Sequence, residues 1–370
     1  MDLTYNSAPR IEVDLDKISH NALTLVTRLR AKGISVTGVT KATLGSAEIA
    51  NAWLRAGVCG LGDSRVENMQ SMRDAQISAP LTLIRSPMIS QVAQVVRLSD
   101  VSFNTEMDVI CQLSLAAGKA QCIHGVVLMV ELGDLREGIM PDQLEATVRA
   151  VLRLPNITFL GIGANLACRS GVSPDCQNMA ELSSLADLID ATFGPIVNTV
   201  SGGNSANLEW ALSGQDTGRI NNLRLGEAML LGCEPLHRRA IDGLHTNAIT
   251  LVAEIIELKI KPSQPWGNLA QAAFGEAAPS ADVGPIKQAI LAIGRQDVDP
   301  DGLLTPLGMK ILAASSDHLI VDVTHYRGPL QVGSEITFQL DYSALLRAMT
   351  SPFIKKVMKR TTINRAVTNV

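Results

Sequence analysis

The stretch Ile34–Ala50, ISVTGVTKATLGSAEIA, decides the fold that this sequence predicts. Its first half alternates β-branched residues with small or polar ones, as a β-strand does. Gly45 and Ser46 then end this pattern, and Ser46 is suited to cap a helix that begins at Ala47. Lys41 therefore lies at the carboxyl end of a strand that leads into a helix. A lysine there is either a surface charge or a reactive amine, and position alone favours the surface charge.

The same strand–helix unit recurs along the first two thirds of the chain. Strands that alternate with helices form parallel βαβ units, and eight such units predict a closed (β/α)8 barrel. In such barrels the catalytic groups lie at the carboxyl ends of the strands. The eight apolar runs are Val36–Thr40, Val58–Leu61, Leu81–Ile84, Val101–Phe103, Val126–Val130, Phe159–Ile162, Val197–Val200 and Leu223–Leu225.

A second domain is expected after the barrel, because β-rich runs and turns replace the helices from about Leu244 onward. These runs are Ala248–Leu258, Ala289–Ile293, Leu319–Thr324 and Glu335–Leu340, with a long loop predicted at 261–284. We expect an N-terminal arm at 1–10, a barrel at 11–240 and a mainly β domain at 241–370 with a helical tail. The fold class is thus α/β: a TIM barrel followed by a C-terminal β domain.

Composition excludes several classes of protein. The 370 residues are 46% hydrophobic and carry a formal net charge of −4, without the basic stripe that nucleic-acid-binding proteins usually show. No apolar run is long enough to cross a membrane, and the first residues lack a signal-peptide core. The six cysteines form no CxxC pair and the six histidines lack metal-ligand spacing. We expect a cytoplasmic protein with reduced core or near-core thiols, no nucleic-acid or membrane partner, and no metal.

Two glycine-bearing segments follow the last two predicted barrel strands. Ser201–Ser205, SGGNS, comes after the seventh run, and Arg224–Glu227, RLGE, comes at the end of the eighth. Loops after strands seven and eight of such barrels often bind phosphate through backbone N–H groups and a hydroxyl. A single Gly-Gly turn is weak evidence, but two loops at these positions, together with Lys41, predict a phosphate-bearing cofactor.

The chain resembles the fold-type III pyridoxal 5′-phosphate (PLP) enzymes, whose layout of barrel plus β domain is that of alanine racemase. Within that group it is most similar to the alanine/ornithine racemase branch. The resemblance is collinear over nearly the whole chain. It rests on the motifs IEVDLDKISHN, GVTKATLG, DSRVEN, RSPMIS, LMVELGDLREGI, LGIGANLAC, SGGNSANL, NNLRLGEAMLLG, AILAIGRQDVDPDGL, AASSDHLIVDVT and LDYSALLRAMTSP.

The resemblance implies a role for each matching residue. Lys41 matches the lysine that forms the Schiff base with PLP and serves as one of two bases for the α-proton. Arg224 matches the arginine that donates to the pyridine nitrogen; an always-protonated guanidinium keeps that nitrogen unprotonated and favours proton return over transamination. Arg136 matches a catalytic arginine that also binds the substrate carboxylate. The remaining cofactor contacts implied are Asn165 near the ring, and Asn204, Ser205, Gly226, Glu227 and Tyr342 around the phosphate.

Three departures from alanine racemase concern the substrate side. Arg295 stands where the family's second catalytic base, a tyrosine, is expected, and Met129 replaces a modified lysine that supports the arginine matched by Arg136. Gly45 replaces a tyrosine near the phosphate. Candidates for the second base are Asp297, Asp317, His318 and, against its high pKa, Arg295. Arg295, Asp297 and Asp317 are also expected to contact substrate, and Glu131 or Asp134 to hold Arg136.

These departures predict a racemase for a basic amino acid. Glu227, Asp297 and Asp299 could pair with the distal ammonium of ornithine or, next, lysine. The alternatives are a decarboxylase or aldolase on the same fold, or a PLP-binding protein without catalysis. Arg224 disfavours the decarboxylase, which needs an acidic group at the pyridine nitrogen, and the β domain disfavours the single-domain carrier. The resemblance also implies a homodimer in which the β domain of one subunit closes the barrel of the other.

Overall fold

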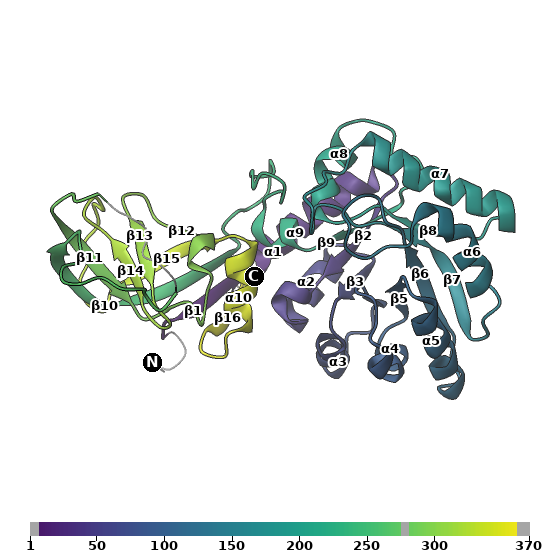
Figure 1. Cartoon of the computed structure of the whole chain (residues 1–370), viewed down its shortest axis with the longest axis horizontal. Helices are drawn as coiled ribbons and strands as arrows, with labels where there is room; N and C mark the ends of the chain where they lie inside the picture. The colour runs from purple at the N-terminus through teal and green to yellow at the C-terminus, as the bar shows by residue number, and fades with distance from the viewer. Residues whose placement is uncertain (1–6, 275–280, 361–370) are drawn as a thin grey trace, which may run out of the picture. The chain divides into compact units, whose positions relative to one another are not determined.

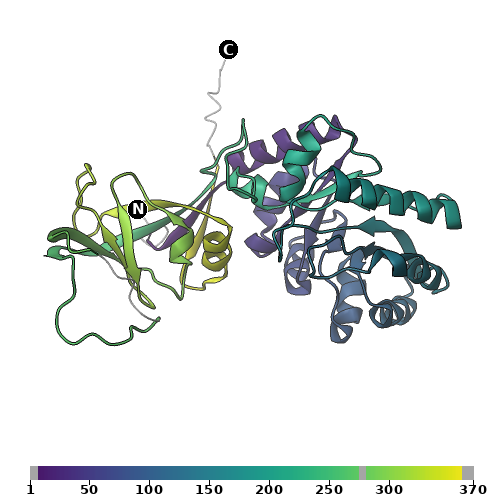
Figure 2. The ribbon, with the colours of Figure 1, turned by 45° about the horizontal axis from the view of Figure 1, so that its top comes forward.

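The computed structural model describes residues 7–274 and 281–360, which form two compact units. One unit is Leu15–His245, and the other combines the residues up to Asp14 with those from Thr246 onward. Figure 1 shows the whole chain, with one helix-rich unit and one strand-rich unit, and Figure 2 gives a second view of the same ribbon. Within the described residues, no helix has the length and apolar character needed to cross a membrane.

The first unit is the predicted (β/α)8 barrel, with the helices outside the strands (Figure 1). Its parallel strands pair in chain order and β9 closes onto β2. The strands are β2 (Ser35–Val39), β3 (Gly60–Asp63), β4 (Leu81–Leu83), β5 (Val101–Asn104), β6 (His124–Met129), β7 (Ile157–Gly163), β8 (Thr199–Ser201) and β9 (Asn222–Leu225). The helices are α1 (Leu15–Arg30), α2 (Ala47–Arg55), α3 (Val66–Asp74), α4 (Val92–Leu98), α5 (Met107–Lys119), α6 (Pro141–Val151), α7 (Cys176–Phe193), α8 (Leu208–Leu212) and α9 (Glu227–Leu231).

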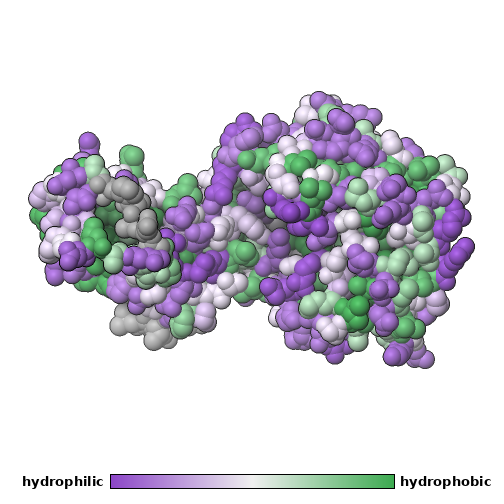
Figure 3. All heavy atoms as spheres, viewed as in Figure 1, coloured by the Kyte–Doolittle hydropathy of each residue, from purple (hydrophilic) through white to green (hydrophobic). Residues whose placement is uncertain are grey.

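Local sequence explains these elements. All six residues of β6 are buried, as expected of a parallel strand covered on both faces. Ser46 is the N-cap of α2 and accepts a hydrogen bond from the backbone N–H of Ile49 at 3.5 Å, as predicted. Asp175 and Asn178 form a reciprocal capping box at the start of α7. On the face shown in Figure 3, hydrophilic residues predominate along the upper edge of this unit, over α7 and α8.

The second unit is mainly an antiparallel sheet, with strand order β12-β15-β10-β11-β14-β13. Its β15 alternates exposed and buried residues, because one face covers the core and the other meets water. The elements are β10 (Ile249–Pro262), β11 (Pro285–Leu291), η4 (Pro300–Gly302), β12 (Leu303–Leu304), β13 (Lys310–Ala314), β14 (Leu319–Asp322), β15 (Glu335–Leu340), α10 (Tyr342–Thr350) and β16 (Lys355–Lys359).

The first strand lies in this second unit and not in the barrel, so the boundaries differ from the predicted 11 and 240. β1 (Arg10–Asp14) pairs with β10 and β16, while residues 241–245 remain with the barrel. Buried Ile11 and Val13 alternate with the partly exposed Glu12, which is the pattern of a sheet with one solvent face. The prediction of an arm followed directly by the barrel was therefore wrong at this point.

The predicted helical tail is α10, which ends at Thr350 before Pro352; the chain then forms β16, and residues 361–370 lie outside the described part. One further prediction needs correction. All six cysteines are free, but Cys59, Cys122, Cys168 and Cys176 are exposed, so they are not core or near-core thiols. The predicted loop at 261–284 begins after Pro262, and its residues 275–280 are outside the described part.

Candidate active site

Lys41 follows β2 directly and begins the short helix η1 (Lys41–Thr43) at the carboxyl end of the barrel. The preceding Thr40 is fully buried and donates from its hydroxyl to a carboxylate oxygen of Asp63 at 2.7 Å. Asp63 also accepts from the side-chain amide of Asn68 and from the backbone N–H of Arg65. Burial raises the pKa of Asp63, and these hydrogen bonds oppose that shift. The segment that carries Lys41 is thus fixed to β3 by the hydrogen bond between Thr40 and Asp63.

Gly45 is required by the backbone of the Lys41 segment. Its φ is +68°, and a Cβ there would lie 2.6 Å from the carbonyl oxygen of Asn68. An L-residue would be strained by the positive φ and would collide with the backbone of α3. The family's tyrosine therefore cannot simply be restored at this position.

The two glycine segments meet, as the sequence predicted. Ser205, which begins η3 (Ser205–Asn207) after β8, accepts a hydrogen bond from the backbone N–H of Ala228 at 3.2 Å. Gly226 is the N-cap of α9, and a Cβ on it would lie 2.9 Å from the carbonyl oxygen of Val39. Glu227 is the first residue of α9 and is partly exposed. The ends of β2, β8 and β9 thus form one surface that carries Lys41, a hydroxyl and closely approaching backbone.

Arg224 is the most buried cation of the barrel site. Its side chain donates to the Ser201 hydroxyl at 2.7 Å, to the carbonyl oxygen of Ala164 at 2.7 Å and to the Asn165 side-chain oxygen at 3.2 Å. The guanidinium carbon lies 5.1 Å from the centre of the Phe103 ring. Burial lowers the pKa of Arg224 to about 10, so the side chain is still a cation at neutral pH.

Asn165 connects Arg224 to the loop after β8. Its side-chain oxygen also accepts from the amide of Asn204 at 3.1 Å, and its own amide donates to the Cys168 sulfur at 2.9 Å. Asn204 in turn donates to the carbonyl oxygen of Leu166. The structure therefore brings Asn165, Asn204 and Arg224 together, as predicted, and adds Cys168, which the sequence did not single out.

Arg136 lies in the loop after β6, where it pairs with the adjacent Glu137 at 3.0 Å. Among the described residues, the predicted supports Glu131 and Asp134 form no ion pair with the guanidinium of Arg136. Asp134 is buried and accepts from the backbone N–H groups of residues 168–170 at 3.1 to 3.2 Å, so it joins this loop to the one after β7. Glu131 accepts from the backbone N–H groups of Gly133 and Leu135. These two carboxylates shape the backbone of the loop instead.

Two predicted site residues of the β unit, Arg295 and Asp297, have structural partners. Arg295 donates from Nε to the carbonyl oxygen of Ala314 at 3.3 Å and lies 5.4 Å from the ring centre of Phe274. Asp297 is 5% exposed and accepts from the hydroxyl of Ser351 at 2.7 Å. Its carboxylate therefore ties this segment to the end of α10, a role that sequence alone could not reveal.

Asp317 and His318 form an exposed pair in the β unit. The His318 Nδ1 and an Asp317 carboxylate oxygen are 2.9 Å apart, and 45% and 58% of these side chains are exposed. The hydrogen bond with His318 lowers the pKa of Asp317. The adjoining segment approaches so closely that a Cβ on Gly294 would lie 2.3 Å from the Asp317 backbone nitrogen. Tyr342 begins α10 in the same unit.

Comparison with known proteins agrees with this geometry. Residues 13–235 match the family of alanine racemase N-terminal domains. The chain is 38% identical to ornithine racemase of Acetoanaerobium sticklandii, covering 94% of this chain and 99% of that protein. It is 36% identical to lysine racemase of Thermotoga maritima, covering 94% and 98%. The crystal structure of alanine racemase from Streptomyces lavendulae superposes with a TM-score of 0.74 at 16% identity, covering 96% and 98%.

The chain belongs to the alanine racemase family. It is thus a PLP-dependent racemase with the barrel-plus-β-domain fold that the resemblance implied. The residues at the barrel end fit PLP chemically: a primary amine for its aldehyde, a hydroxyl and closely approaching backbone for its phosphate, and a buried cation for its ring. In Arg224 the hydrogen bonds use the two Nη atoms, so among the described residues Nε has no acceptor and suits a further one.

The family's modified lysine has no polar counterpart here, because Met129 is buried in an apolar cluster with Phe103 and Val127. Sequence reasoning missed Asp63, gave Ser201 no role of its own within the SGGNS segment, and assigned Asp134 to Arg136 instead of to backbone N–H groups. Asp63, Ser201 and Asp134 are each a buried polar side chain at or just after a strand end. That position was a usable signal for Asp63 and Ser201, whereas the partners of Asp134 are 34 to 36 residues away in the chain.

Proposed function

We propose that this protein interconverts L- and D-ornithine, with lysine as the next best substrate. The observation that carries this proposal is the pair of relatives that cover nearly the whole chain, both of which are racemases of basic amino acids. The reaction removes the α-proton on one face of the substrate and returns a proton on the other. When bound, PLP stabilises the negative charge that develops at the α-carbon.

In this proposal the barrel supplies the cofactor site. Lys41 would supply the amine for the cofactor aldehyde and one base for the α-proton. Ser205 and the backbone at Gly226 would hold the phosphate, to which the resemblance also assigns Tyr342. Arg224 donates to the ring nitrogen, which is consistent with its lack of a carboxylate contact among the described residues. A decarboxylase would need an acidic group in its place.

The substrate carboxylate is proposed to bind Arg136. A guanidinium matches a carboxylate in geometry, and the partly exposed pair with Glu137 can exchange for a substrate. For the distal ammonium we favour Glu227, a partly exposed carboxylate that begins α9 at the barrel end. Glu227→Gln should then lower the preference for ornithine over alanine about tenfold, as expected from losing a charged partner.

The second base is proposed to be His318, positioned by Asp317. Imidazole is a common general base in enzymes, whereas a guanidinium group has only donors and no lone pair to accept a proton. Asp297 is the weaker candidate, since its carboxylate is buried against Ser351. We further propose a homodimer in which each site uses both chains, and a cytoplasmic location, which the six free cysteines support.

The deciding experiment is incubation of the PLP-loaded enzyme with L-ornithine, L-lysine, L-arginine and L-alanine in D2O. Chiral chromatography and mass spectrometry follow configuration and α-deuterium together. D-ornithine with one α-deuterium, formed faster than any other D-enantiomer, is the expected product. An amine or aldehyde product without an inverted enantiomer would replace racemisation by decarboxylation or aldol cleavage.

A complementation assay tests the shared site. Lys41→Ala and His318→Gln subunits, each inactive, are mixed, dissociated and allowed to reassociate. If each site uses both chains, half of the dimers contain one intact site, and the mixture regains about a quarter of the wild-type activity. A site formed within one chain predicts no recovery.

A further inference from the structure

Ser201 and Asn222 lie below Arg224 in the barrel, and the proposed function gives them no role. Ser201 is the last residue of β8, Asn222 is the first of β9, and their side chains are almost fully buried. The Ser201 hydroxyl is 2.7 Å from Arg224 Nη1 and 2.7 Å from the side-chain oxygen of Asn222. The three residues thus form a continuous chain of hydrogen bonds.

The direction of this chain follows from its far end. The Asn222 amide nitrogen lies 3.0 Å from the Thr37 hydroxyl and 3.2 Å from the Ser35 hydroxyl, and it donates to both. The Asn222 side-chain oxygen is therefore the acceptor that faces Ser201. Ser201 has one proton, which it donates to Asn222, so a lone pair of its oxygen accepts from Arg224. The arginine is held by an oriented but uncharged partner.

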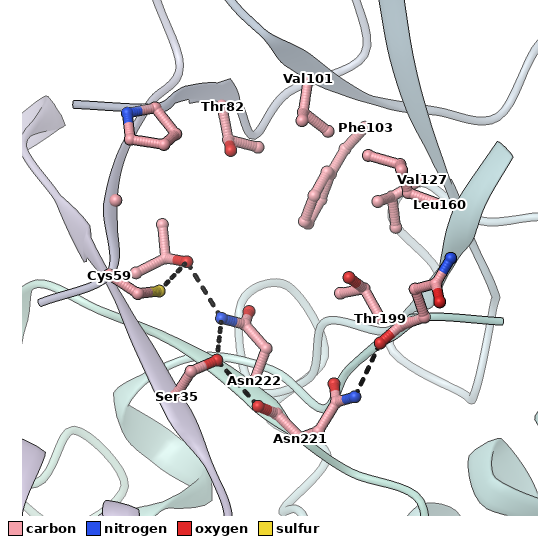
Figure 4. A pocket seen from close by; sticks show the side chains of 14 residues that line it. Ser35, Cys59, Thr82, Val101, Phe103, Val127, Leu160, Thr199, Asn221 and Asn222 are labelled. Carbon is pink, nitrogen blue, oxygen red and sulfur yellow. Dashed lines mark hydrogen bonds between the residues drawn. The ribbon is translucent and has the colours of Figure 1, made fainter. Parts of the chain in front are cut away.

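The far end of the chain opens onto a cavity of about 300 Å³ at the amino end of the barrel strands. Its described lining contains no charged residue (Figure 4). Ser35 and Asn222 lie on one side of the cavity, Phe103 points into it from the other, and Thr37 is also part of the lining. Phe103 is also the ring against which Arg224 packs, at 5.1 Å. Phe103, which packs against the guanidinium, and Asn222, which is joined to it through Ser201, therefore both line this cavity.

We propose that Ser201 and Asn222 are positioning residues that fix Arg224 against the cofactor ring and thereby suppress transamination. The inference rests on the proposed donation from Arg224 to the ring nitrogen. A fixed guanidinium disfavours a second positive charge on that nitrogen, which keeps the ring weakly electron-withdrawing. Without Ser201 or Asn222 the guanidinium is less well oriented, and the ring nitrogen gains a proton more readily.

A protonated ring changes where the returning proton goes. It adds to the C4′ carbon of the cofactor in place of the substrate α-carbon, and water then hydrolyses the C=N bond. The substrate leaves as a 2-keto acid, and the amino group stays on the cofactor as pyridoxamine phosphate. No oxidant is needed, because the substrate loses the electron pair that the cofactor gains.

The test compares Ser201→Ala, Asn222→Ala and the double variant with Ser114→Ala. Ser114 is a matched control because its buried hydroxyl in α5 donates to the carbonyl oxygen of Pro155, away from Arg224. Water can enter the adjoining cavity and replace the Asn222 amide, so Asn222→Ala is expected to fold even if Ser201→Ala does not. Two quantities are measured: the pH titration of the bound cofactor's absorbance, and pyridoxamine phosphate formed per racemisation event.

Both single variants should raise the pKa of the ring nitrogen and increase transamination per racemisation about tenfold, as expected for one lost hydrogen bond to a charged group. The double variant should be no worse than either single one, because a chain of contacts is broken only once. Unchanged titration and partition, with the same loss of stability as Ser114→Ala, would overturn the inference while leaving the proposed function intact. A wild-type protein without a cofactor band would instead overturn the proposed function.

Discussion

The barrel and the β unit use their polar residues in opposite ways. In the barrel, Arg224 and Ser201 are buried and held by several hydrogen bonds each. In the β unit, Asp317 and His318 are largely exposed and contact mainly one another and Ser315. Buried, satisfied polar groups hold a fixed geometry, whereas exposed ones adapt to what binds them. The difference teaches that the polar groups around Arg224 are fixed by the fold, whereas those at Asp317 and His318 are free to adjust.

The largest effect is expected at Lys41. Lys41→Ala should lower racemisation at least about 10⁴-fold, because it removes both the Schiff-base amine and one base. Chiral chromatography measures the rate, and the absorbance of the bound cofactor reports loss of the Schiff base. Lys119→Ala, at the exposed end of α5, is the control and should be unaffected. If Lys41→Ala retained activity, Lys41 would not be the Schiff-base lysine, and the carboxyl end of β2 would not carry the cofactor site.

His318→Gln tests the exposed Asp317–His318 pair of the β unit. It should lower racemisation about 10³-fold, within the range for losing a general base. Exchange of the α-proton for deuterium should persist for the one enantiomer whose proton faces Lys41, which NMR in D2O detects. His325→Gln, an exposed histidine of the same unit, is the control. Equal loss of exchange for both enantiomers would show that His318 is not the second base.

Acid should weaken the barrel through His124. Burial lowers the pKa of His124 from 6.5 to about 4, although it lies 2.8 Å from the Ser102 hydroxyl. Between these two pKa values, His124 is protonated in the unfolded chain and neutral in the folded barrel. Stability is therefore complete above pH 6.5 and is lost as pH falls toward about 4, by about 3 kcal/mol.

His124→Gln should flatten this dependence, since glutamine keeps a polar group and does not titrate. Denaturant unfolding at several pH values measures it. Fluorescence follows the barrel because Trp53 and Trp210 are buried there. An unchanged acid slope in His124→Gln would mean that other groups determine the acid sensitivity.

The smallest of these effects is expected at Asp134, which joins the loops after β6 and β7. Asp134→Ala removes the acceptor of three backbone N–H groups and should cost about 2 kcal/mol of stability. It should also raise KM more than it lowers kcat, because the loop carries Arg136. Asp322→Ala, at the end of β14 in the β unit, is the control, because this partly exposed carboxylate accepts only from the nearby Thr324 among the bonds of the described residues. A loss of stability no greater than that of the control would contradict the expectation that polar groups are held more tightly in the barrel than in the β unit.

The sequence by itself determined the periodic features and the reactive groups. Alternating strand and helix patterns were enough for the barrel, and the resemblance of its motifs to a known family singled out Lys41, Ser205 and Arg224 at predicted strand ends. These features depend on backbone periodicity and side-chain chemistry, which are local properties of the chain. The same alternation in residues 11–14 already indicated a sheet with one solvent face, although it was first assigned to the barrel.

Only the tertiary structure decided what each buried polar group contacts. Asp134 accepts from backbone N–H groups, Asp297 accepts from Ser351, and Ser201 accepts from Arg224 and donates to Asn222. Their partners are 21 to 54 residues apart in the chain. A carboxylate looks the same in sequence whether it binds a substrate or its own backbone. The choice is made by which donors the fold brings within hydrogen-bonding distance, and by how much water burial removes.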